Sequence, residues 1–189
     1  MQQTIKNIRG ILIYTVIVLL VSVAYYIYAY TAQTIPEEHK TFLTKIGKKL
    51  GEAGMWLLIF IYCRTLLKLI LGQGKLAQRL LPDYVSPVGS SALNQLLAWL
   101  NRTHIYFGIA AVAVILLHIF MMDFSRYSHI LFFPALLGLV IWQGVFGLFL
   151  TLRFSTAELK KFSYLVHAQF VTGIAIGIFA WLGHVLIDD

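Results

Sequence analysis

The chain has 189 residues, of which 59% are hydrophobic and 12% charged, with a formal net charge of +7. Its mean hydropathy of +0.79 is far above that of a soluble domain, so we expect one all-α bundle domain, residues 1–189, whose surface faces lipid. The single cysteine, Cys63, excludes a disulfide framework, a thiolate zinc site and an iron–sulfur motif. The basic residues flank apolar segments, which indicates helix anchoring and argues against nucleic-acid binding.

Five apolar segments are each long enough to cross a hydrocarbon layer of about 30 Å. In chain order they are residues 11–31, 54–71, 104–122, 130–152 and 162–187. The first follows Lys6 and Arg9, as a signal peptide would, but it is too long and ends in tyrosines, so we expect a retained span. Two connecting pieces, 38–52 and 91–100, mix polar and apolar residues as interfacial helices do. The sequence therefore predicts a membrane bundle of about five transmembrane helices.

The distribution of basic residues predicts the orientation of the bundle. If the N-terminus is cytoplasmic, that side receives Lys6, Arg9, Lys75, Arg79, Arg102, Arg153, Lys160 and Lys161. The other side receives Lys40, Lys45, Lys48, Lys49 and Arg126. Positive residues accumulate on the cytoplasmic side, so we expect a cytoplasmic N-terminus and an integral protein of a bacterial inner membrane.

Two histidines in the third apolar segment are the strongest functional signal. His104 and His118 are fourteen residues apart. In an α-helix this interval rises about 21 Å and returns to within about 40° of the same face. Ionisable groups inside a membrane span suggest function by default, and neutral imidazole is a good axial ligand for iron. The spacing favours two haem irons, one near each membrane surface.

The fifth apolar segment carries a second pair, His167 and His184. Segments three and five start on the same side of the membrane, so depth pairs His104 with His167 and His118 with His184. The seventeen residues between His167 and His184 turn about 100° off the starting face of an ideal helix, which calls for tilt or a π-bulge. A lone histidine near a helix end is more often interfacial than a ligand, but four matched in depth favour ligation. His39 and His129 are expected in loops, with His129 as a reserve ligand.

Small residues near these histidines have two readings. Gly108, Gly173, Gly177 and Gly183 would let either a porphyrin or a neighbouring helix approach closely. Plain helix packing is at least as good an explanation for any one of them. Arg102, Arg126 and Arg153 fall near the expected haem edges and are candidates to pair with propionates, although anchoring helices at the interface is their default role.

Several motifs resemble the ferric reductase-like transmembrane family, over about residues 47–184. They are Gly51-x-x-Gly54-Met-Trp-Leu-Leu, Arg64, Asn-Arg-Thr-His104-x-x-x-Gly108, His118, and Lys160-Lys161 before Leu165-Val166-His167. The resemblance implies that histidines of the third and fifth helices hold haems and that electrons cross the membrane between them. Carried over to this chain, the ligands are His104, His118, His167 and His184.

The sequence thus predicts a membrane cytochrome with two b-type haems, each held by two histidines. It carries no Gly-x-Gly-x-x-Gly fingerprint for flavin or nicotinamide, so electrons must come from and go to other molecules. A quinol, a reductase, or a redox protein or catalytic subunit are the candidates, and a quinone is a further candidate cofactor. We expect an electron-transfer subunit of a larger oxidoreductase rather than a complete enzyme. The alternatives are a transporter or structural anchor without haem, and a non-haem metal enzyme, for which closer histidine clusters or carboxylates are missing.

Overall fold

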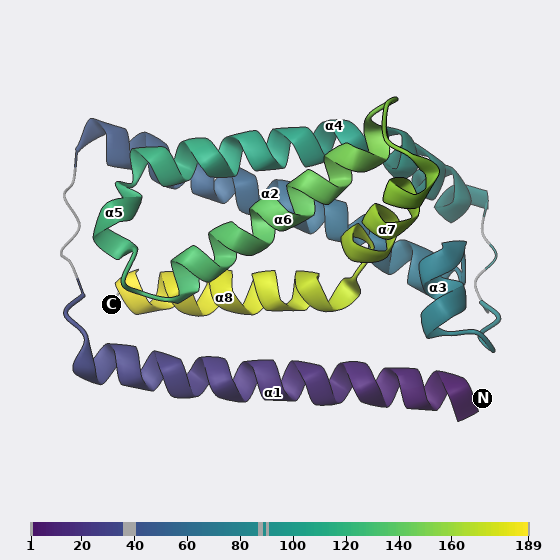
Figure 1. Ribbon diagram of the computed structural model, residues 1–189, viewed down its shortest axis with the longest axis horizontal. Coiled ribbons are helices and arrows are strands. Elements are labelled where there is room, and N and C mark those ends of the chain that lie inside the picture. The colour runs from purple at the N-terminus through teal and green to yellow at the C-terminus, as the bar shows by residue number, and fades with distance from the viewer. Residues whose placement is uncertain (1, 36–40, 87–88, 90, 189) are drawn as a thin grey trace.

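The computed structural model describes residues 2–35, 41–86, 89 and 91–188. These residues form eight helices and no strand. In chain order the helices are α1 (Gln2–Ala32), α2 (Phe42–Ile70), α3 (Gly74–Leu80), α4 (Ser91–Met121), α5 (Phe124–Tyr127), α6 (Phe132–Thr151), α7 (Ala157–His167) and α8 (Phe170–Asp188). Figure 1 shows them as an elongated bundle, with the N-terminus, α3 and α7 at one end and α5 and the C-terminus at the other.

Five of the helices are long and apolar enough to cross a membrane, namely Thr4–Ala32, Phe42–Ile70, Ser91–Met121, Phe132–Thr151 and Phe170–Ile187. The predicted all-α bundle is confirmed, and the chain has the architecture of an integral membrane protein. α1, α4 and α8 run in one direction, and α2 runs back beside α4 (Figure 1). α8 packs against both α1 and α6 and is the most enclosed of the five. α8 is therefore the central helix of the bundle.

The two expected interfacial helices are wrong as separate elements. Residues 42–52 are the first turns of α2, and residues 91–100 are the first turns of α4; residues 38–40 lie outside the described part. Both helices continue because they pack along each other. A Cβ at Gly47 would lie 3.0 Å from Sδ of Met122, and one at Gly54 would lie 2.9 Å from Ile115. Such close backbone approach stabilises a long helix pair in lipid.

The fifth expected span is also corrected, because it is two helices. α7 ends at His167, and α8 begins at Phe170 after a turn at Ala168 and Gln169. The Ala168 N–H bonds back to the carbonyls of Tyr164 and Val166, which closes α7. The side chain of Gln169 accepts a hydrogen bond from Thr172 in the first turn of α8. α7, which carries Lys160 and Lys161, is an amphipathic piece outside the apolar span.

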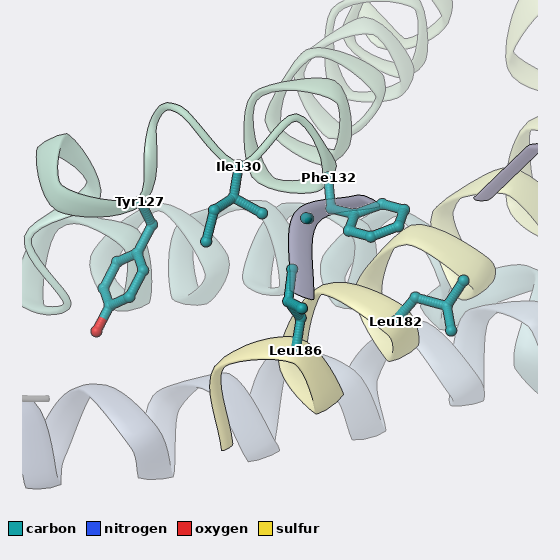
Figure 2. Close-up of a cluster of buried hydrophobic side chains, with 6 residues drawn as sticks. Tyr127, Ile130, Phe132, Leu182 and Leu186 are labelled. Atoms are coloured by element: carbon teal, nitrogen blue, oxygen red, sulfur yellow. The ribbon is translucent and has the colours of Figure 1, made fainter. Parts of the chain in front are cut away.

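A compact hydrophobic cluster fixes the connection between α5 and α6 onto α8. Its buried members are Ala29, Tyr127, Ile130, Phe132, Leu182 and Leu186, most of which are labelled in Figure 2. Tyr25 of α1 supports the same junction, since its hydroxyl accepts a hydrogen bond from the Leu131 N–H at 2.8 Å and its ring meets Phe132 edge-on. The cluster therefore sets where the C-terminal half of α8, including His184, lies in the bundle.

Candidate functional site

The four candidate histidines come from three helices. His104 and His118 lie on α4, His167 is the last residue of α7, and His184 lies in the last turns of α8. The turn at residues 168–169 separates the axes of α7 and α8. His167 and His184 therefore do not lie on one continuous helix, so the rotation of about 100° expected between their faces does not apply. Neither tilt nor a π-bulge is needed.

The structure brings the histidines together in two pairs, in the combination that their depth predicts. The ring centroids of His104 and His167 lie 6.0 Å apart, with an interplanar angle of 59°. Those of His118 and His184 lie 6.1 Å apart, with an angle of 23°. The first pair therefore links α4 to the end of α7, and the second links α4 to α8; we call α7 and α8 together the α7–α8 arm. In the described part of the chain, the backbone of α4 makes no extensive contact with either helix of this arm.

The separation within each pair suits two imidazoles that share one metal ion. An imidazole nitrogen binds a first-row metal at about 2 Å. The ring centre lies about 1 Å beyond that nitrogen, so two rings on opposite sides of one ion have centroids about 6 Å apart. In the described residues no group of three or more His, Cys, Asp or Glu side chains is placed to hold a metal. A metal held by either pair would therefore take its remaining ligands from groups other than these side chains.

Three of the four rings are oriented by backbone carbonyls. Nδ1 of His118 lies 2.8 Å from the Gly47 carbonyl, Nδ1 of His167 lies 3.0 Å from that of Gln143, and Nδ1 of His184 lies 2.7 Å from that of Ala180. A carbonyl only accepts, so each Nδ1 carries the proton and each Nε2 keeps its lone pair. Metal-ligating histidines are usually oriented by such a bond at the other nitrogen.

His104 differs from the other three. Its Nδ1 is buried and meets no hydrogen-bond partner among the described atoms. A buried polar nitrogen without a partner costs free energy unless a ligand or water satisfies it. His104 is therefore the least constrained member of the two pairs.

Two glycines make room for the rings. A Cβ at Gly51 of α2 would lie 2.9 Å from Cε1 of His118, and a Cβ at Gly147 of α6 would lie 2.9 Å from Cε1 of His167. Each ring therefore rests against the backbone of a neighbouring helix. Gly51 belongs to the motif at the start of the second expected span, whereas Gly147 carried no recognisable signal in the sequence.

The four glycines singled out in the sequence divide into two kinds. Gly173 packs against the ring of Tyr62, and Gly183 packs against Phe132 and Phe133, so both serve helix packing. A Cβ at Gly108 or at Gly177 would meet no neighbouring side chain or helix within 4 Å. Gly108 lies one turn from His104, and Gly177 lies two turns from His184, each on the same helix face as its histidine. Open space therefore borders both histidine-bearing faces.

The three arginines considered from the sequence have different surroundings. Arg102 and Arg153 have exposed side chains, and Arg126 forms an ion pair with Asp123 at 3.1 Å. Arg64 of α2 also lies near a histidine pair, because its Nε donates a hydrogen bond to Oδ1 of Asn101, three residues before His104 on α4. The sequence carried two signals for this residue, its position in an apolar segment and its place among the motifs of the family resemblance, but neither assigned it to a haem.

The remaining histidine and the surface hollows lie apart from the two pairs. His129 donates from Nε2 to the Thr34 carbonyl at 3.1 Å, which accounts for this loop residue, and His39 lies outside the described residues. The larger of the two described hollows, about 580 Å³, is apolar and is lined by α2 side chains and Phe107. Neither hollow includes any of the four histidines.

No known protein family matches this chain, and no curated protein or solved structure is significantly similar to it. The resemblance to the ferric reductase-like family therefore stays a prediction from short motifs.

Proposed function

We propose that this chain is a membrane cytochrome that holds two b-type haems, one between His104 and His167 and the other between His118 and His184, and that it carries electrons across the bilayer. The observation that carries the proposal is the pairing of four imidazoles, at 6.0 and 6.1 Å, between α4 and the α7–α8 arm. The open space beside Gly108 and Gly177 supports it, because a macrocycle needs room along the same faces.

Haem supplies a one-electron iron couple, and the protein residues tune and position it. The two imidazoles of each pair would hold the haem iron, and the bound haem would supply electron transfer rather than oxygen or substrate binding. The carbonyls of Gly47, Gln143 and Ala180 hold three imidazoles in one tautomer and orientation. The α4 histidines are separated by about 21 Å along the helix, so the two sites lie near opposite membrane surfaces.

The proposed setting is a bacterial inner membrane with the N-terminus in the cytoplasm. α7, which ends at His167, lies at the same end of the bundle as the N-terminus and α3 (Figure 1). Lys75, Arg79, Lys160 and Lys161 also lie at this end, as expected for the cytoplasmic face. The partners that fit are a quinol or reductase on one side and a redox protein or catalytic subunit on the other, which makes the chain one subunit of a larger oxidoreductase.

Single His→Ala variants of the purified protein test the proposal. Reduced-minus-oxidised spectra of wild type should show b-type α and Soret bands. His104→Ala, His118→Ala, His167→Ala and His184→Ala should each lose about half of that signal, whereas the matched control His129→Ala should keep all of it. A wild-type protein without these bands would leave a transporter or structural anchor as the better function. A His184→Ala variant that keeps both haems would show that this ligand is misassigned.

A further inference from the structure

Two basic side chains of α2 lie partly buried beside the His104–His167 pair. Arg64 and Lys68 are four residues apart, so they share one face of the helix. Like charges at this spacing repel, and cations removed from water are costly unless an anion compensates them. Among the described residues neither side chain forms an ion pair with a carboxylate; the pairs Lys49–Glu52 and Arg126–Asp123 involve other residues. No carboxylate in the described part of the chain therefore offsets this charge.

The guanidinium of Arg64 is held in place by α4. Its Nε donates a hydrogen bond to Oδ1 of Asn101 at 2.8 Å, which leaves the terminal nitrogens for another acceptor. Asn101 is three residues before His104 on α4, so the Arg64 side chain is held within about one turn of this histidine. Lys68 follows one turn after Arg64 on the same face of α2. Helices α2 and α4 therefore bring basic side chains close to the His104–His167 pair.

A carboxylate is the ligand that this arrangement fits. Arginine binds a carboxylate through two parallel hydrogen bonds, and lysine adds a point charge. Haem b carries two propionate carboxylates. If His104 and His167 held a haem, Arg64 and Lys68 of α2 would be available to bind these groups.

We propose that Arg64, Lys68 and Asn101 form a carboxylate-binding site that receives the propionates of the haem held by His104 and His167. The inference rests on the proposed function. It assigns the propionates of this haem to α2 in place of Arg102 and Arg153, whose side chains are exposed.

The test compares haem b with its dimethyl ester, in which both carboxylates are blocked. The full-length chain is prepared without haem, loaded with either compound, and followed through the low-spin resonance signal that His104→Ala removes. Wild type should bind haem b about 10- to 100-fold more tightly than the ester, the gain expected from charge-assisted hydrogen bonds. Arg64→Gln should lose most of this preference, and Arg64→Lys should restore part of it.

Controls separate a folding defect from the loss of a contact. Arg79→Gln removes an exposed charge from α3 at the same end of the bundle and should keep the wild-type preference. The signal of the second haem reports whether Arg64→Gln is folded. Equal binding of haem b and ester by wild type, or a preference lost in Arg102→Gln and kept in Arg64→Gln, would overturn the carboxylate site. A wild type that binds neither compound would instead refute the proposed function.

Discussion

The imidazole of His118 lies directly against Gly51, so that a single Cβ at position 51 would come within 2.9 Å of its Cε1. One turn earlier on α2, the Gly47 carbonyl accepts the Nδ1 proton of the same ring. The start of α2 therefore fixes both the position and the rotation of His118, although α2 carries no ligand itself.

Gly51→Val should displace the His118 ring and break its bond to Gly47. Overpacking of this kind costs about 1–3 kcal/mol, and loss of an orienting bond lowers metal affinity about 10- to 100-fold. We expect the variant to lose the haem of the His118–His184 pair, measured by haem content per chain. Gly10→Val on α1, where a Cβ would meet nothing within 4 Å, makes the same change in helix propensity and should keep both haems. Full haem content in Gly51→Val would contradict the role of this contact.

Gly108→Leu tests whether the open space beside His104 belongs to a ligand. The protein itself leaves room for a side chain there, and replacing glycine within a helix gains up to about 1 kcal/mol in helix propensity. We therefore expect a folded variant that has lost the haem of the His104–His167 pair, read from the absorbance spectrum together with thermal unfolding. The control is Gly10→Leu. A stable Gly108→Leu protein with both haems would show that the space has another purpose.

The two histidine pairs should give distinct low-spin signals in electron paramagnetic resonance. The angle between the axial imidazole planes governs the splitting of the iron d orbitals, and it is 59° in one pair and 23° in the other. We expect the His104–His167 haem to give the more anisotropic signal, and His104→Ala to remove it selectively. Two identical signals in the oxidised protein would contradict the different ring orientations.

Ile130→Ala tests the hydrophobic cluster that holds the α5–α6 connection against α8. Ile130 is fully buried, and truncating such a side chain costs about 2–5 kcal/mol in the free energy of unfolding. Val85→Ala is the matched control, since Val85 is 87% exposed and its truncation should change stability by less than about 0.5 kcal/mol. Thermal unfolding in detergent measures both. Equal stability of the two variants would show that this cluster does not hold the junction.

The sequence predicts the long helices well because lipid imposes a simple rule on length and hydropathy. The pairing of His118 with His184 follows from their equal depth on helices that run in the same direction. The turn at Ala168 and Gln169 could not be predicted, since neither proline nor glycine marks it. The continuous α2 could not be predicted either. Gly47 and Gly54 let the first turns of α2 pack closely against the α4 region, and this contact is visible only in the structure. The role of Arg64 depends on Asn101, thirty-seven positions away, and no local pattern reports such a contact.

The number of haems per polypeptide is the most direct test of this account. A pyridine haemochrome assay on the purified full-length protein, combined with quantitative amino-acid analysis, gives that ratio. Two paired imidazole sites predict two b-type haems per chain. A ratio of one would remove the second site, and a chain that folds and inserts normally but contains no haem would contradict the cytochrome proposal altogether.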